Sequence, residues 1–116
     1  MADTAPHKVG GGAYATWQAA GAGTNAGVTV TRTGAASRIQ YATGIQCSGD
    51  LAALVTIESP ASTVLWRKRI TGVGWQFSEN FQVGPIAGAA GSDILVKISA
   101  STSNCEANME GYAGRA

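Results

Sequence analysis

The sequence predicts an all-β protein: an antiparallel β-sandwich, jelly-roll-like, with seven to eight short strands and an extended N-terminal arm. Two observations predict this fold class. Short segments that alternate apolar and polar residues are separated by turn residues roughly every 8 to 12 positions, the spacing typical of sandwiches and jelly rolls. No segment has the apolar period of about 3.6 residues that marks an amphipathic helix.

We divide the chain into an extended N-terminal arm, residues 1–20, and a β-sandwich domain, residues 21–116. The arm contains a proline and three consecutive glycines, a composition typical of a flexible segment. Its last part includes Tyr14 and Trp17, and disordered tails contain few aromatic residues. We therefore expect these two side chains to anchor the arm, either on its own domain or on a neighbouring subunit.

The first two strands of the domain are expected at residues 27–33 and 38–47. The first is rich in β-branched residues and alternates strictly, with Val28 and Val30 on one face. The second is long for one strand and has Gly44 in its middle. A glycine at such a position predicts a bulge or a bend.

A third strand is expected at residues 51–59, between a Ser-Gly-Asp turn and a Ser-Pro turn. Its alternation predicts two faces: inward Ala53, Val55 and Ile57, and outward Thr56 and Glu58.

The remaining strands are expected at residues 63–70, 75–83, 94–99 and 105–112. The first of these should place Val64, Trp66, Lys68 and Ile70 on one face and Leu65, Arg67 and Arg69 on the other. In the second, the shared apolar face should consist of Trp75, Phe77, Phe81 and Val83, interrupted by Glu79. In the last two strands, the side chains expected to point inward are Ile94, Val96, Ile98, Cys105, Ala107 and Met109.

The composition limits the classes of function. Apolar residues make up 45% of the 116 residues, enough for one core, whereas only 13% are charged and the net charge is +1. This charge argues against a nucleic-acid partner, and no apolar run approaches the ~20 residues of a membrane helix. A surface poor in charge and rich in small residues is typical of a protein packed against neighbours, and equally of a plain small-residue-rich β protein.

The two cysteines, Cys47 and Cys105, are too few for a disulfide scaffold and their spacing matches no zinc motif. Two alternatives remain open for these cysteines: they are buried free thiols, or they form a disulfide between two strands. The N-terminus lacks the apolar core of a signal peptide, so we expect synthesis in the cytoplasm.

The residue types needed for catalysis are not gathered in the sequence. The only histidine, His7, lies in the arm, which argues against a nucleophile–histidine site. Glu106 and Glu110 share a strand face but are too far apart to share a proton. The other carboxylates of the domain are scattered: Asp50, Glu58, Glu79 and Asp93. We therefore expect no enzyme activity, no cofactor and no bound metal.

Arg67 and Arg69 form the one charged patch that strand alternation predicts. The plain interpretation is a solvated edge strand, protected by its charges from pairing. The alternative is a contact with an acidic partner surface. Trp66 and Trp75 are most simply core residues, although the sequence leaves open whether either is exposed.

The order of strands and turns over residues 37–112 resembles small β-sandwich proteins encoded among the structural genes of tailed bacteriophages. These include capsid decoration (cement) proteins with a jelly-roll-like fold. The segments on which the resemblance rests are 38–50, 53–57, 63–67, 72–85, 94–100 and 110–112. The N-terminal arm has no counterpart in this resemblance.

The resemblance implies a structural protein of the capsid exterior, made in the host cytoplasm, that bridges neighbouring major capsid subunits as a homo-oligomer, either a dimer or a trimer. Neither nucleic acid nor a membrane is expected as a partner. The expected contacts are Tyr14, Trp17, Arg67 and Arg69. The alternative is a receptor- or glycan-binding module of a phage head or tail fibre, which predicts exposed tryptophans or tyrosines at one end of the sandwich.

Overall fold

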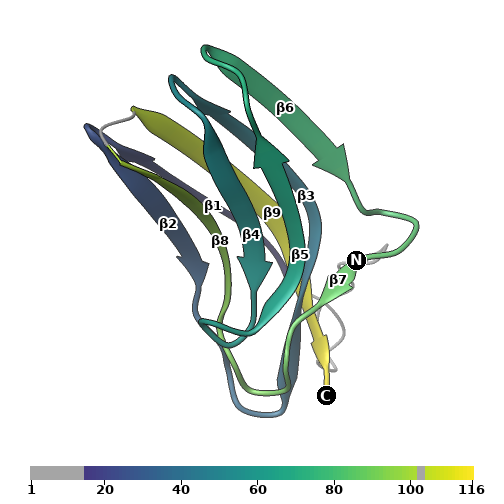
Figure 1. Cartoon of the computed structure of the whole chain (residues 1–116). Helices are drawn as coiled ribbons and strands as arrows, with labels where there is room; N and C mark the ends of the chain where they lie inside the picture. Colours follow the sequence, from purple (N-terminus) through teal and green to yellow (C-terminus); the bar gives the residue numbers. More distant parts are fainter. Residues whose placement is uncertain (1–14, 102–103) are drawn as a thin grey trace.

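The structure, a computed structural model of the chain, describes residues 15–101 and 104–116. These residues form nine strands in two antiparallel sheets that pack face to face (Figure 1). In chain order the strands are β1 (Ala15–Gly23), β2 (Ala26–Arg32), β3 (Arg38–Gly49), β4 (Ala53–Glu58), β5 (Val64–Ile70), β6 (Trp75–Asn80), β7 (Ile86–Ala87), β8 (Ile94–Ser101) and β9 (Cys105–Arg115). The all-β sandwich that the sequence predicts is confirmed.

The strand order is that of a jelly roll. Sheet A has the order β1-β9-β3-β6, with β7 also paired to β3, and sheet B has the order β2-β8-β4-β5. Because β6 and β7 pair with successive parts of β3, they share one position in the sheet. The pairs are nested along the chain: β1 with β9, β2 with β8, β3 with β6 and β7, and β4 with β5. Nested pairs placed alternately in two sheets give the eight-position jelly roll.

The core lies between the sheets and consists of the inward residues that alternation predicts. Sheet B contributes Ala53, Val55, Ile57, Ile94, Val96 and Ile98, none more than 6% exposed. Sheet A contributes Trp17, Ile45, Cys47, Cys105, Ala107 and Met109. Burying one large aliphatic side chain stabilises a fold by roughly 1.5–3 kcal/mol, so these layers are the main source of stability.

Strand β3 is bent where the sequence predicts a bulge. Ala42 pairs with Gly111 and Gly44 pairs with Glu110, so Thr43 is the extra residue. A Cβ atom on Gly44 would lie 3.1 Å from Oε2 of Glu110, so the glycine leaves room for this carboxylate. The bulge also separates the part of β3 that pairs with β7 from the part that pairs with β6.

The first strand begins before the expected domain boundary. β1 pairs along its whole length with β9, so residues 15–20, which are expected in the arm from the sequence, belong to sheet A. Only a short turn between Gly23 and Ala26 separates β1 from β2. Alanine and glycine, which dominate β1, are depleted in strands, and this obscured its signal.

The outward direction of Thr56 and Glu58 is as the sequence predicts, whereas the expected place of Val83 is wrong. Thr56 and Glu58 lie on the outer face of β4 but are only 4% and 6% exposed, since neighbouring groups cover them. Val83 does not join the apolar face of β6 and is fully exposed. The strand ends at Asn80, whose Oδ1 accepts a hydrogen bond from the Gln82 amide and so turns the chain away.

Candidate functional site

Trp17, one of the two expected arm anchors, is part of the core. Its side chain is 6% exposed and its strand position pairs with Gly111. The guanidinium carbon of Arg32 lies 5.7 Å from the centroid of its ring. Trp17 therefore docks on its own domain, the first of the two alternatives. Tyr14, the other expected anchor, lies outside the described residues.

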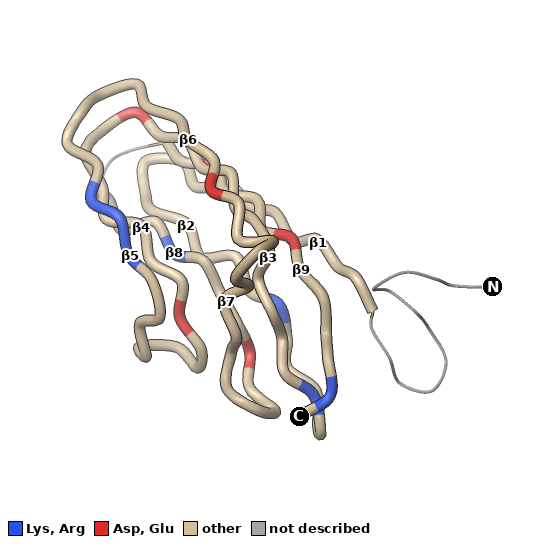
Figure 2. Tube along the Cα trace, turned by 90° about the vertical axis from the view of Figure 1, so that its right-hand side faces the viewer, with Lys and Arg blue, Asp and Glu red and all other residues tan. Residues whose placement is uncertain are grey.

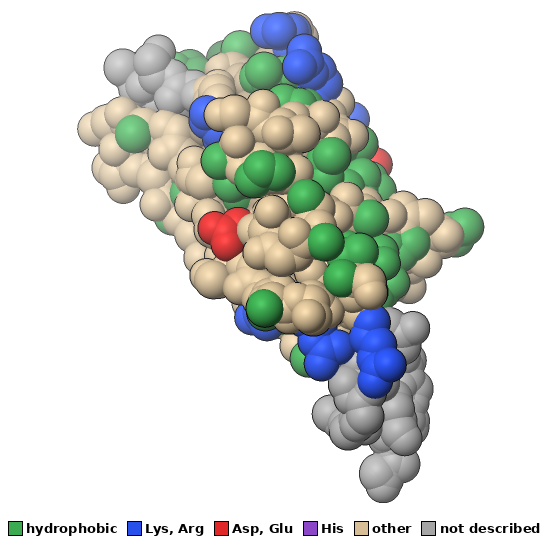
Figure 3. All heavy atoms as spheres, turned by 90° about the horizontal axis from the view of Figure 1, so that it is seen from below, with side chains coloured by type: hydrophobic (Ala, Val, Ile, Leu, Met, Phe, Trp, Pro, Cys, Tyr) green, Lys and Arg blue, Asp and Glu red, His purple; other side chains and the backbone are tan. Residues whose placement is uncertain are grey.

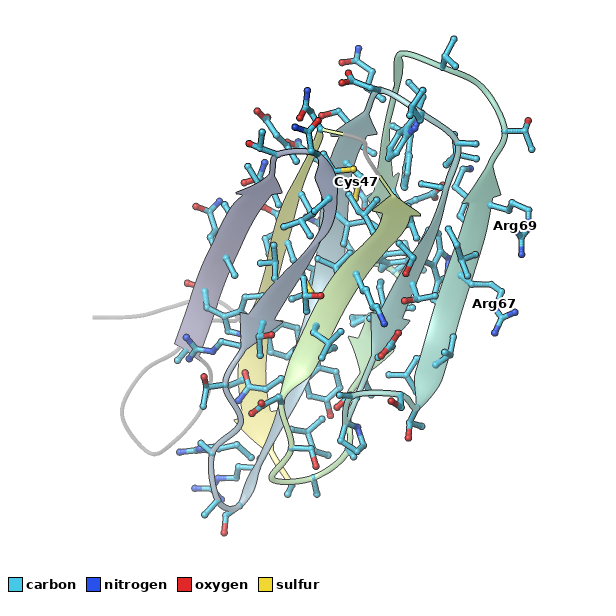
Figure 4. All side chains as sticks on the ribbon, turned by 60° about the vertical axis from the view of Figure 1, so that its left-hand side comes forward. Cys47, Arg67 and Arg69 are labelled. Atoms are coloured by element: carbon cyan, nitrogen blue, oxygen red, sulfur yellow. The ribbon has the colours of Figure 1, made fainter. Side chains whose placement is uncertain are left out.

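Arg67 and Arg69 are exposed and point away from the sandwich (Figure 4). Both lie on β5, an edge strand whose one neighbour among the described strands is β4. At the start of the same strand, Val64 and Leu65 are each 39% exposed. We call these four residues the β5 surface. It places apolar and guanidinium groups beside a strand edge, whose backbone groups are available to a partner.

Further apolar side chains are exposed at one end of the molecule. Seen from below, hydrophobic side chains spread across this end and basic side chains lie at its margins (Figure 3). Apolar side chains exposed together in this way are a feature of surfaces that bind a partner.

Aromatic side chains fill the space between β5 and β6. The Trp66 ring lies 6.4 Å from that of Phe77 and 5.7 Å from that of Phe81, measured between centroids. Trp75 stacks on Phe77 at 5.8 Å. All four side chains are half-buried. Trp66 and Trp75, whose exposure the sequence left open, therefore pack against the core and remain partly accessible.

The outer face of sheet A is hollowed along its length, and we call this hollow the sheet A groove. It consists of three adjoining hollows with volumes of about 380, 390 and 530 Å³. Amide and hydroxyl side chains dominate the lining: Thr16, Gln18, Thr43, Gln46, Ser48, Gln76, Ser78, Asn80, Gln82 and Asn108. Three acidic residues, Glu79, Glu106 and Glu110, also line it, whereas basic residues gather along β5 and near the C-terminus (Figure 2).

A pair of tyrosines lies on the same outer face. Tyr41 and Tyr112 are partners across β3 and β9, and their rings stack with centroids 4.8 Å apart and an interplanar angle of 17°. Tyr112 follows Glu110 by two residues, so both point to the same side of the sheet. Sequence reasoning missed the groove and this pair. The available signal was the run of amides and hydroxyls at outward positions of four strands, which a solvated sheet face can also show.

The Glu58 carboxylate has a structural environment. It accepts hydrogen bonds of 2.7 Å from the Ser62 backbone N–H and from Thr56 Oγ1. These two hydrogen bonds, the Ser62 bond most, hold the pKa of Glu58 below its ordinary value; Lys97 acts in the same direction and burial opposes it. Glu58 is therefore an ionised group that fixes the β4–β5 turn.

Cys47 and Cys105 are both buried and are not joined by a disulfide. Cys47 lies in the interior between the two sheets (Figure 4). Burial raises the pKa of Cys47 to about 12, and the nearby Cys105 thiol acts in the same direction. Since the thiolate is the nucleophilic form, Cys47 is unreactive at neutral pH.

Within residues 15–101 and 104–116, no group of three or more His, Cys, Asp or Glu side chains is placed to hold a metal ion. In the same part of the chain there is no helix long and apolar enough to cross a membrane. The one histidine, His7, lies outside the described residues.

Comparison with known proteins gives no relative: no family model matches the chain, and no curated protein matches it. Function is therefore inferred from the fold and from the surfaces described above.

Proposed function

We propose that this chain is a structural virion protein of a tailed bacteriophage, which decorates the capsid exterior and stabilises it by bridging neighbouring major capsid subunits. The observation that supports this best is the β5 surface: Val64, Leu65, Arg67 and Arg69 beside an open strand edge.

The fold supports the proposal. The jelly roll is the architecture that the resemblance to decoration proteins implies, and it spans the segments on which that resemblance rests. One fold can host many functions, so the function is inferred from the surface.

The β5 surface has the chemistry of a protein contact. The planar guanidinium groups of Arg67 and Arg69 can each bind a carboxylate with two parallel hydrogen bonds. Val64 and Leu65 add apolar area, and the free edge of β5 offers backbone hydrogen bonds to a strand or extended segment of the capsid subunit.

Bridging also favours a protein with more than one contact. We propose that the chain acts as a dimer or trimer, since linked weak contacts raise the overall affinity by effective concentration. Light scattering of the full chain measures this directly: a discrete dimer or trimer is expected, and a monomer both free and on heads would contradict it.

The proposal is tested on phage heads that lack this chain, prepared by deleting its gene. Adding the full chain should give saturable binding and raise the temperature at which the heads release DNA. R67A/R69A should bind about tenfold more weakly, as expected when two charged interface contacts are lost.

The matched control is R115A, which removes an exposed cation from β9 of the other sheet. It should bind like the wild-type chain. Failure of the wild-type chain to bind heads would reject the proposal, and unchanged binding by R67A/R69A would reject the β5 surface as the contact.

A further inference from the structure

The sheet A groove has the chemistry of a carbohydrate site, and we propose that it binds a neutral oligosaccharide chain along its length. The site lies on the outer face of sheet A and is separate from the β5 surface, which belongs to sheet B. Binding here is thus independent of attachment to a capsid.

The three hollows form one continuous groove. The first and second share Gln46, Ser78 and Asn108. The first and third share Gln18, Thr43 and Glu110. Each of the three hollows has a volume within the range of about 300–1,000 Å³ that is common for ligand sites. A groove of joined, open hollows suits an extended ligand better than a compact one.

The lining side chains match the hydroxyl groups of a sugar. An amide such as Gln46 or Asn108 presents a donor and an acceptor side by side, and a hydroxyl such as Thr43 can act as either. Neighbouring hydroxyls on a sugar ring have the same dual character. Side chains of this kind come from all four long strands of sheet A, so they can contact a chain laid across the sheet.

The charge of the groove selects a neutral ligand. No lysine or arginine is among the described residues that line the three hollows, whereas Glu79, Glu106 and Glu110 do line them. Phosphate, sulfate and nucleic acid would meet carboxylates without a compensating cation, which is unfavourable. The lining is also poor in apolar side chains, unlike the buried centre of a protein interface.

The tyrosine pair extends the groove at one end. Along β9 the outward residues run Glu106, Asn108, Glu110 and Tyr112, a distance of about 20 Å at ~3.4 Å per residue. Tyr112 is stacked on Tyr41 and half-buried, so its ring position is fixed while part of it stays accessible. A fixed aromatic face with a polar tip can pack against the C–H face of a sugar ring.

The carboxylates of Glu106 and Glu110 can accept hydrogen bonds from sugar hydroxyls. Glu106 and Glu110 are four residues apart on one strand, so their Cα atoms are about 13 Å apart. Carboxylates whose Cα atoms are this far apart can contact different sugar units of one chain. We therefore assign both residues as acceptors for sugar hydroxyls.

The test uses the full chain and a panel of neutral hexasaccharides: cello-, malto-, laminari-, manno- and N-acetylchitohexaose. Saturation-transfer NMR and calorimetry measure binding up to millimolar concentration, and a heparin hexasaccharide serves as the charged probe. At least one neutral glycan should bind and heparin should not. Q46A/N108A should weaken that binding about tenfold, since two hydrogen bonds are lost.

The control T29A/T31A removes two exposed polar side chains from the edge strand β2 of sheet B and should bind like the wild-type chain. Absence of binding to every neutral glycan of the panel would refute the proposal, as would stronger binding to heparin. Equal losses in Q46A/N108A and T29A/T31A, or no loss in the former, would show that the groove is not the site.

Discussion

The two lateral sides of the sandwich are closed in different ways. On the β1–β2 side, small residues let the sheets approach closely: a Cβ atom on Gly21 would lie 3.0 Å from Cγ2 of Val30. Trp17 is buried there beneath Arg32. On the β5–β6 side, half-buried aromatic side chains such as Trp66 fill the space, and β5 keeps an open edge.

The comparison separates a side that stabilises the fold from a side that is suited to binding. A contact made close to the backbone in a well-packed interior has little room to adjust. Half-exposed side chains beside an open strand edge can change rotamer and accept a partner. Substitutions on the β1–β2 side should therefore reduce stability most, and those on the β5–β6 side should affect stability less.

The largest expected effect is that of W17A. Removing this buried side chain should lower the free energy of unfolding by about 3–5 kcal/mol, whereas W66A on the half-buried side should lower it by roughly half as much. Urea denaturation of both variants measures the difference. Equal losses would show that the two sides stabilise the fold equally. A stable W17A would show that Trp17 is an arm anchor and not a core residue.

Gly111 tests how closely β9 approaches its neighbours. A Cβ atom there would overlap the carbonyl oxygen of Tyr41 and come within 2.6 Å of Cζ2 of Trp17, so G111A should destabilise the fold by about 3 kcal/mol. G72A, in the β5–β6 loop where a Cβ atom meets nothing within 4 Å, should change stability by less than about 0.5 kcal/mol. Chemical denaturation compares the two, and a tolerated G111A would mean that the strands can separate.

Glu58 gives the β4–β5 turn a pH-dependent contribution. Because its pKa is lowered in the folded state, its ionised form stabilises the fold above the ordinary glutamate pKa of about 4.3. This contribution is lost as the pH falls below that value through the lower folded-state pKa. E58Q should reduce stability by about 1.5 kcal/mol at neutral pH and by less in acid. Unfolding curves recorded from neutral to acid pH check this, and a constant difference between the two proteins would contradict it.

Gln40 is a buried polar residue without hydrogen bonds from its side chain. It is 1% exposed, and neither Oε1 nor Nε2 has a partner within the described part of the chain. Q40M keeps the shape and removes the buried polar atoms, so it should raise the free energy of unfolding by about 1 kcal/mol. Thermal unfolding measures the change. A loss of stability would mean that an ordered water satisfies this amide.

The smallest effect is expected from the ion pair on the β5–β6 side. Lys68 Nζ lies 3.4 Å from Glu79 Oε2, and the two side chains are 41% and 34% exposed. A double-mutant cycle with K68A and E79A should give a coupling below about 1 kcal/mol, reduced further by salt. A coupling of about 2 kcal/mol or more would show that this side is held as firmly as the β1–β2 side.

Local features of the fold could be predicted because strand signals are local. The alternation places Val55 and Ile57 inward, Gly44 marks the bulge of β3, and Arg67 and Arg69 are exposed as alternation predicts. Each of these features depends on neighbours along the chain.

Other features could not be predicted, because they depend on residues distant in sequence. β1 has little propensity of its own and is defined by pairing with β9, about ninety residues away. The sheet A groove exists because β1, β3, β6 and β9 lie side by side. The burial of Glu58 requires the turn that brings the Ser62 amide to its carboxylate.

The most direct test of the decoration proposal is quantitative mass spectrometry of purified virions, separated into head and tail fractions. The account predicts this chain in the head fraction, at a fixed ratio to the major capsid protein, and accessible to surface labelling of intact particles. Absence of the chain from virions, or its presence in the tail fraction alone, would contradict the account.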